Sequence, residues 1–562
     1  MNTLEQEILD TVSLEEPWAL IESFATFKRE HPDDVNRGMD EVILRLRTHG
    51  VEVSIHNANL FLSLPKHARV EAKGKTYRAK PAAYSADVRA GLTGQLVYVK
   101  NVERRPELAD CVRGKVVISY GLARTRLISA FEEMGAVGVI CINPGIDIHS
   151  GTCTTIWGTP DLDDLPRKPK IPAVAVNKQD GDELAAIADR GDSVTIFTEM
   201  EEGWFASKLP EVFIKGAEEP DKYVLLHGHL DSWDVGVGDN ATGDATMLEI
   251  ARVLWQHRNK LRRSVRICWW PGHSTGRYAG STWFSDTFAL DLEENAVAHV
   301  NCDSPGCRWA TEFTNLPRMS ETEEFLASVI LEVAGKQIEG ERPGRESDYS
   351  FNGIGISGYM SGSSMMSDVL RDEKGYYSVG GCGGNIGWHT EHDTIEIADK
   401  SSLLRDINIY LLAVVRNANA EILPFDWRYT AREFAATVAD YQAKASDRFD
   451  LTPSQDAIAM LAAALDIFYS RVENKNIEPK IANRVIQDLA RILVPINFTR
   501  VDRFRHDPAM EIPPLPSIAA AAELDIHSGT TLGFAQTQLI RGQNRLTSAL
   551  RQACRHIDLL VP

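Results

Sequence analysis

The sequence predicts an α/β protein in which a mainly parallel, mixed sheet is flanked by helices, with an inserted β-rich segment and a C-terminal helical bundle. Between residues 222 and 423, apolar strand-like runs alternate with amphipathic helical runs, a pattern typical of parallel sheets covered by helices. Residues 91–199 carry short apolar runs separated by Gly, Pro and Asp, which favours strands joined by turns. Beyond residue 424 the apolar spacing becomes helical.

The first residues of the chain belong with the alternating region. Residues 14–48 show helical apolar spacing, and residues 51–64 alternate between apolar and polar side chains as a strand does. We therefore assign residues 1–90 and 200–423 to one α/β domain, which is interrupted by residues 91–199.

The inserted segment and the end of the chain form two further units. One helical pattern, residues 125–136, lies among the strand-like runs of the inserted segment. In residues 424–562, apolar side chains recur at spacings of three and four, as at Ile458, Leu461 and Leu465. We expect this last region to fold as a helical bundle.

The composition of the chain excludes several classes of protein. Its 562 residues are 43% hydrophobic and 25% charged, which is globular, and the length suggests roughly three to four domains. With 79 acidic against 60 basic residues, the chain lacks the basic surface of a nucleic-acid binder. It shows neither a signal-like N-terminus nor a long apolar span, so we expect a cytoplasmic protein that binds no membrane. Its eight cysteines include no C-x-x-C pair, and we expect most of them to be buried thiols.

Chemically useful side chains follow the predicted strands. In parallel α/β sheets ligands bind beyond the carboxyl ends of the strands. His229 and Asp231 follow one strand, Asp239 begins the next helix, Asp303 follows another strand, and His389 lies in a later loop. Imidazole and carboxylate together suit a divalent cation, and Asp239 could bridge two ions. We expect Asp231 to hold the His229 ring in one tautomer by accepting its other N–H.

Each of these residues also has an ordinary explanation when taken alone. An Asp at the start of a helix is commonly a cap, as Asp239 could be, and His389 could be a plain loop histidine. Two further histidines, His227 and His392, lie close by in the sequence and are weaker ligand candidates. The joint placement of the four side chains is what favours a metal site.

At these residues the sequence resembles a known family, the dinuclear zinc aminopeptidases and carboxypeptidases, which include glutamate carboxypeptidase and the non-catalytic transferrin receptor. The segments that carry the resemblance are GHLDSWD with GDNATG, NCDSPG, SDYSFNGIGI and WHTEHDT. The resemblance implies a zinc aminopeptidase fold, with residues 91–199 as the inserted protease-associated domain. It also implies that residues 424–562 form a dimerisation domain, and hence a homodimer. The metal ligands that it implies are His229, Asp239 and Asp303, with His389.

The sequence departs from this family at one place. In active members the strand equivalent to VRICWW leads into a Glu-Glu pair; one Glu takes a proton from the metal-bound water and the next binds the second metal. Here the segment reads CWWPGHSTGRYAGS, which puts His273 and Ser274 at those positions. His273 could accept the proton, or it could bind the second metal. Arg277 and Tyr278 are candidate substrate contacts, together with Ser274, because an Arg can bind a carboxylate.

The predicted ligands determine how many metal ions the site can bind, and of which kind. One ion keeps His229, Asp239 and Asp303, whereas the second keeps only Asp239 and His389 unless His273 joins them. We therefore expect one or two ions. Zinc is the expected metal, and the donor set also accepts manganese, iron or cobalt.

These observations lead to one main hypothesis and two alternatives. The main hypothesis is a cytoplasmic, homodimeric metallohydrolase that cleaves an amide-type C–N bond in a small, modified or peptide-like amino-acid substrate, with His273 as base and Asp231 supporting the site. One alternative is a metal-dependent lyase in which His273 removes a carbon-bound proton. The other is a non-catalytic, receptor-like dimer that binds a partner protein. Residues 359–385, rich in Gly and Ser, could be a lid or a surface loop.

Overall fold

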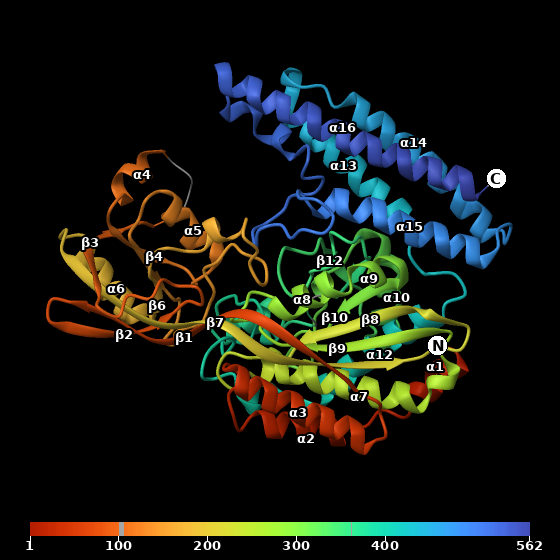
Figure 1. Ribbon diagram of the computed structural model, residues 1–562, viewed down its shortest axis with the longest axis horizontal. Helices are drawn as coiled ribbons and strands as arrows, with labels where there is room; N and C mark the ends of the chain where they lie inside the picture. The colour runs from red at the N-terminus through yellow and green to blue at the C-terminus, as the bar shows by residue number, and fades with distance from the viewer. Residues whose placement is uncertain (101–105, 361, 363, 562) are drawn as a thin grey trace.

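The computed structural model describes residues 1–100, 106–360, 362 and 364–561. Residues 101–105 of the predicted insertion, residues 361 and 363 of the Gly-rich loop and residue 562 lie outside the described residues. The described chain forms a central α/β lobe, a smaller lobe built from the early part of the sequence, and a layer of long C-terminal helices (Figure 1).

The central sheet matches the predicted alternation of strands and helices. Its strands β9, β8, β10 and β13 are parallel, and β7 pairs with β9 in the opposite direction. Their bounds are β7 Ser193–Ile214, β8 Glu219–His229, β9 Arg263–Trp270, β10 Ala296–Asn301 and β13 Gly358–Tyr359. The sheet is therefore mixed and mainly parallel, as the sequence predicted.

Helices cover both faces of this sheet (Figure 1). The face with the N-terminal helices carries α2 Glu15–Phe24, α3 Pro32–Thr48, α7 Thr242–Gln256 and α12 Lys400–Asn419. The other face carries α8 Ala279–Thr287, α9 Ala289–Asn295 and α10 Glu323–Ala334. The remaining elements of this lobe are α1 Thr3–Leu9, α11 Asp368–Glu373, β11 Thr314–Pro317 and β12 Glu339–Glu341. The part of β8 from residue 223 to residue 229 is buried, which is typical of a strand that helices cover on both faces.

The smaller lobe grows out of two long strands. Strand β1, Ser54–Ala72, pairs along most of its length with β7, and the ends of both strands extend into the smaller lobe. There, strand pairing runs from β1 through the remaining strands to β3 and back to β7. These strands are β2 Lys75–Pro81, β3 Leu92–Tyr98, β4 Val116–Tyr120, β5 Gly138–Ile142 and β6 Ala173–Val176.

The smaller lobe contains more helix than its sequence suggested. The expected helical pattern forms α5, Thr125–Glu133, and two unpredicted helices are present as well, α4 Pro106–Val112 and α6 Lys178–Ala188. Strands β3 to β6 are parallel, which requires crossover segments between them. The short helices supply part of those crossovers, so the lobe is α/β rather than purely β.

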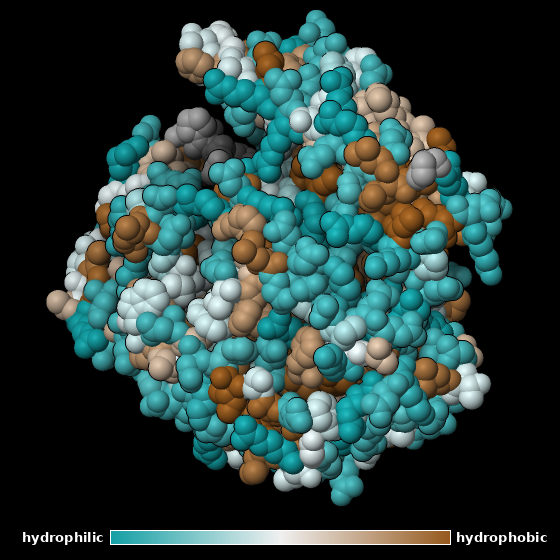
Figure 2. All heavy atoms as spheres, turned by 45° about the vertical axis from the view of Figure 1, so that its right-hand side comes forward, coloured by the Kyte–Doolittle hydropathy of each residue, from teal (hydrophilic) through white to brown (hydrophobic). Residues whose placement is uncertain are grey.

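The C-terminal region consists of long helices, as predicted. They are α13 Trp427–Ala445, α14 Thr452–Glu473, α15 Pro479–Phe498 and α16 Gly529–Leu560. Arg491 of α15 donates to the backbone carbonyls of Gly355 and Ala296, which ties these helices to the central lobe. The surface in Figure 2 is mainly hydrophilic, with small groups of apolar side chains. Within the part of the chain that is described, no helix combines the length and apolar character needed to span a bilayer.

Candidate metal centre

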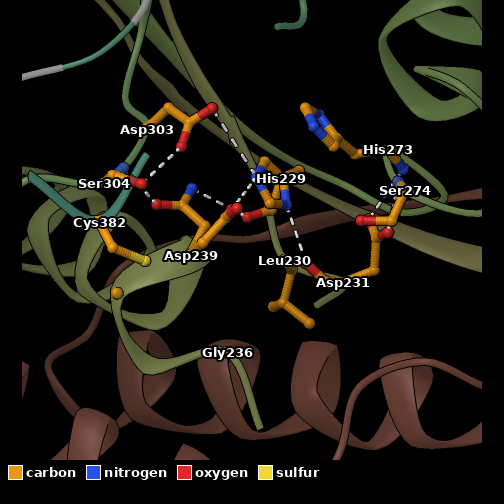
Figure 3. Close-up of polar contacts among 12 residues, drawn as sticks. His229, Leu230, Asp231, Gly236, Asp239, His273, Ser274, Asp303, Ser304 and Cys382 are labelled. Carbon is orange, nitrogen blue, oxygen red and sulfur yellow. Dashed lines mark hydrogen bonds and ion pairs between the residues drawn. The ribbon is translucent and has the colours of Figure 1, made fainter. Parts of the chain in front are cut away.

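The four predicted ligands converge at the carboxyl end of the central sheet. His229 is the last residue of β8, and Asp303 lies two residues after β10. Asp239 belongs to a short turn, Val237–Ala241, that precedes α7, and His389 comes from the loop before α12. Figure 3 shows the side chains of His229, Asp239 and Asp303 directed toward one another. The topology thus brings together residues that are 160 positions apart.

Asp239 lies between two imidazoles, as a bridging ligand would. Its Oδ1 atom is 3.0 Å from Nε2 of His229, and its Oδ2 atom is 3.1 Å from Nε2 of His389. Nε2 of His229 is also 3.9 Å from Oδ2 of Asp303. Zinc ligands lie about 2.0–2.2 Å from the ion, so neighbouring donors are separated by roughly 3–3.5 Å. The two Asp239 contacts have that spacing.

The tautomers of the two histidines show that a cation fits this cluster. Nδ1 of His229 is 2.8 Å from the carbonyl of Asp231, and Nδ1 of His389 is 3.0 Å from the carbonyl of Ser150. A carbonyl only accepts hydrogen bonds, so each Nδ1 carries a proton and each Nε2 atom faces Asp239. Nε2 of His229 is buried and has no hydrogen-bond partner. A lone pair facing a carboxylate is repulsive unless positive charge lies between them.

The electrostatics of the cluster agree with this geometry. Burial lowers the pKa of His229, but the close carboxylate of Asp239 outweighs it and holds that pKa well above its ordinary value. Burial, followed by the nearby Asp239 charge, raises the pKa of Asp303 to about 6. Asp239 is itself buried, yet its contacts with the two imidazoles keep its pKa well below the usual range. The cluster therefore stabilises positive charge at its centre, carried by a proton or by a divalent ion.

His273 lies against the ligand set and has a carboxylate partner. Its ring stacks on that of His229, with centroids 3.8 Å apart and an interplanar angle of 20°. One of its ring nitrogens lies within 4.8 Å of donor atoms of His229 and Asp303. Its Nδ1 atom is 2.9 Å from Oδ2 of Asp348, which is completely buried. Burial opposes the charge on Asp348, but His273 outweighs it and lowers the pKa of that carboxyl group.

Sequence reasoning did not single out Asp348. The residue lies in the segment SDYSFNGIGI, which was noted only as part of the family resemblance. Its partner, His273, is 75 positions earlier in the chain, and no local pattern connects the two. The only available signal was a carboxylate within a segment shared with the family.

Asp231 supports the site through both its backbone carbonyl and its carboxylate. The carbonyl oxygen of Asp231, not its carboxylate, contacts the His229 ring. Its carboxylate instead accepts the backbone N–H groups of His273 and Ser274, at 2.8 and 2.9 Å. Asp231 therefore faces the other N–H of the His229 ring, as the sequence predicted, but through its backbone carbonyl, whereas its carboxylate caps the turn that carries His273.

The remaining candidates occupy distinct places. Tyr278 is buried, and its ring centroid is 4.7 Å from that of His273; the intervening turn contains Ser274 and Arg277. His227 is buried and contacts His299 and Trp270 rather than the ligand set. His392 is mostly exposed and contacts Asp147. It does not contact Asp239, the carboxylate that His229 and His389 share.

The cysteines near the site have structural contacts. The thiol of Cys302 points to the carbonyl of Gly243 in the core, as expected for a neighbour of Asp303 on the opposite side of the chain. Cys382 donates to Asp393, whose carboxylate also accepts the backbone N–H of Asp239. Cys382 and Asp393 thus help to place the shared ligand.

The smaller lobe also contributes to the site. The backbone N–H of Ser150 donates to the carbonyl of His389, and the carbonyl of Ser150 accepts from Nδ1 of the His389 ring. The hydroxyl of Thr152 donates to the carbonyl of Ser274. The neighbouring His149 contacts the carbonyl of Trp388 and the hydroxyl of Tyr377, both at 2.7 Å. One short segment of this lobe therefore supports both the His389 loop and the turn after β9.

Comparison with known proteins shows which protein families the sequence resembles. Residues 212–414 match the family described as Peptidase family M28. A probable glutamate carboxypeptidase of Zea mays, VP8, is 25% identical over 468 residues, which cover 70% of this chain and 65% of the relative. The chain thus spans less than two thirds of that relative. The aminopeptidase NAALADL1 of Mus musculus is 42% identical over 94 residues, or 16% of this chain and 12% of the relative.

A solved structure confirms the architecture. The zinc aminopeptidase BSAP of Bacillus subtilis superimposes with a TM-score of 0.55 at 19% sequence identity, covering 73% of this chain and 96% of BSAP. The aminopeptidase fold and the resemblance to zinc aminopeptidases and glutamate carboxypeptidases, both inferred from the sequence, are confirmed.

Proposed function

We propose that this chain, whose central lobe resembles the peptidases of family M28, is a metal-dependent hydrolase that cleaves an amide-type C–N bond in a small, modified or peptide-like amino-acid substrate. The observation that carries the proposal is the His273–Asp348 pair. It lies directly against the ligand set, where active relatives are expected to have two glutamates.

The ligand set accommodates one complete and one partial ion position. His229, Asp239 and Asp303 would hold the first ion, and Asp239 with His389 would hold the second. Zinc fits these donors, as do manganese, iron and cobalt. When bound, a divalent cation supplies Lewis acidity and lowers the pKa of a coordinated water.

The chain's own residues supply the proton transfer. Asp348 accepts the Nδ1 proton of His273, which leaves Nε2 free to take a proton from the attacking water and pass it to the leaving nitrogen. The imidazolium formed in between is stabilised by the buried Asp348 carboxylate. Asp231 keeps the ring in place because its carboxylate caps the turn at His273 and Ser274.

The C-terminal helices support a dimer as part of this proposal. Several of their large apolar side chains are exposed, namely Met460, Ile467, Phe534 and Ile540. Such residues on long helices suit a contact with a second copy of the chain. We also propose that the smaller lobe is a protease-associated domain whose segment around Ser150 and Thr152 helps to form the active site.

The test is a substrate screen with metal-supplemented protein. Aminoacyl p-nitroanilides, dipeptides and N-acyl amino acids are incubated with the protein and zinc, manganese or cobalt. We expect His273→Ala to lower kcat by about 10²–10⁴-fold, since that is the usual contribution of a general base. His273→Glu should recover part of the rate, and His392→Ala, an exposed histidine of the same region, should leave it unchanged.

Product analysis in oxygen-18 water distinguishes hydrolysis from elimination. A hydrolase places the label in the carboxyl product, whereas a lyase does not consume water. Full activity of His273→Ala would reject the assigned role of His273. Unlabelled product would reject hydrolysis.

A further inference from the structure

A loop joins two of the candidate metal ligands. Residues 230–236 follow His229, the last residue of β8, and lead into the turn that carries Asp239. Asp234 in this loop has a left-handed backbone, with φ of 53°. Residues other than glycine rarely adopt this conformation, so contacts from outside the loop must hold it in place.

One side chain between α2 and α3 holds both ends of this loop. Arg29 donates to the carbonyls of Leu230, Val235 and Gly236, at 2.9, 2.9 and 3.0 Å. In Figure 3, Leu230 and Gly236 lie on the side of the ligand cluster that faces the red N-terminal helices. Arg29 therefore ties the loop, and with it the spacing of the two ligands, to those helices.

No carboxylate touches Arg29 within the described part of the chain. Its side chain is completely buried, and all of the hydrogen bonds of that side chain go to backbone carbonyls. Burial lowers the pKa of Arg29, and nearby carboxylates oppose this effect. Asp244 does so most strongly, followed by Asp393, Asp231 and Asp239. A buried guanidinium depends on such balancing charges, because removal from water is costly for an ion.

Asp244 is buried in the complementary way. It lies in the first turn of α7, it is completely buried, and neither carboxylate oxygen has a hydrogen-bond partner among the described residues. Burial raises the pKa of Asp244 well above its usual range, and Arg29 is the charge that opposes this most. His229 opposes it as well, whereas Asp231 and Asp239 add to it. Arg29 and Asp244 are therefore each other's main opposite charge.

We propose that Arg29 and Asp244 are positioning residues that act as a buried charge pair beside the metal centre. Arg29 fixes the loop between His229 and Asp239. Asp244 balances the guanidinium charge, which would otherwise repel a divalent cation bound to those ligands. The proposal rests on the metal centre of the proposed function, but not on the reaction that takes place there.

Two conservative substitutions test the pair through metal affinity. Asp244→Asn, which keeps the shape of the side chain, should weaken cobalt binding by about 10–100-fold, the usual loss for a residue that supports a metal ligand. Arg29→Lys replaces the planar guanidinium with a single ammonium group, so it should also weaken binding and alter the visible absorption of the bound cobalt. Affinity is measured by competition with a chelator, on protein whose circular dichroism matches that of the parent.

A double variant tests whether the two residues act together. Arg29→Met leaves the Asp244 carboxylate buried without its balancing charge. Adding Asp244→Asn to Arg29→Met should therefore raise the thermal midpoint and cause no further loss of cobalt affinity. Effects of residues that act separately would instead add.

Two control variants remove similar groups elsewhere. Glu249 is a completely buried carboxylate of the same helix, paired with Arg252. Arg491 also donates to four backbone carbonyls, none of which belongs to the loop at the metal centre. Glu249→Gln and Arg491→Met should lower the thermal midpoint but leave the cobalt affinity of the parent protein.

The outcomes separate the pair from the reaction. Parent-like cobalt affinity in Asp244→Asn and Arg29→Lys, or a parent protein that binds no cobalt, overturns the proposal. Additive losses in the double variant also overturn it, because the two residues would then act independently. Weakened binding in both single variants, together with a parent protein that cleaves no amide, would leave the pair standing and reject the proposed function.

Discussion

The two sides of Asp239 have unequal surroundings. Oδ1 faces His229, with Asp303 close to the same imidazole nitrogen, so three donors meet there. Oδ2 faces His389 alone among the predicted ligands. The family resemblance predicts a glutamate ligand at the position of Ser274. If that donor is missing, we expect a weaker ion position on the Oδ2 side and a complete one on the Oδ1 side.

The two sides also differ in how they are built. His229 ends a strand in the middle of the sheet, and Asp303 lies just beyond the neighbouring strand. His389 comes from a loop that is attached to the smaller lobe through Ser150 and His149. Donors on a rigid sheet are held more firmly than donors on a loop, so we expect the first side to bind its ion more tightly.

The largest expected effect comes from removing the ligand that both sides share. Asp239→Asn removes the negative charge that the two proposed ion positions share. Loss of a residue that only supports a ligand costs up to about 100-fold, so loss of this ligand should lower metal affinity and kcat by more than that. Metal content after dialysis is measured by mass spectrometry. Asp286→Asn, an exposed aspartate paired with His506, is the control. Full metal content in Asp239→Asn would contradict the bridging assignment.

A smaller change should affect one side only. His389→Gln removes the single imidazole on the Oδ2 side, so the weaker ion should be lost while the tighter one stays. Titration with cobalt would then show one binding phase instead of two, or an unchanged single phase if only one ion binds. Loss of the tight phase would contradict the unequal division of donors.

The sequence predicted the fold better than it predicted the second layer of the site. The alternation of strands and helices between residues 222 and 423 was predicted correctly, because hydrophobic periodicity is a local property. Of the four predicted ligands, which the structure brings together, His229 and Asp303 were proposed because they come at strand ends that share one edge of the sheet. Asp348 and the true role of the Asp231 carboxylate were missed, since both depend on contacts between distant segments. Helix α4 was missed because it has only seven residues, and α6 because its sequence, KQDGDELAAIA, contains an Asp-Gly-Asp run typical of a turn.

The smallest expected effect concerns the attachment of the His389 loop. Burial lowers the pKa of His149 to about 4, against about 6.5 for a free histidine. Between these values the unfolded chain binds a proton that the folded chain does not, so stability falls as pH drops from 6.5 toward 4. His149→Gln should remove up to about 3 kcal/mol of that decline. Urea unfolding at several pH values measures it; an unchanged slope would contradict the assignment.

The most direct test of the account is the metal content of His273→Ala, measured beside its activity. If His273 carries protons and the donors on either side of Asp239 bind the ions, this variant will retain the metal content of the parent protein while kcat falls. If the metal is lost together with the activity, His273 is a ligand, and the division of roles between His273 and the Asp239 cluster is wrong.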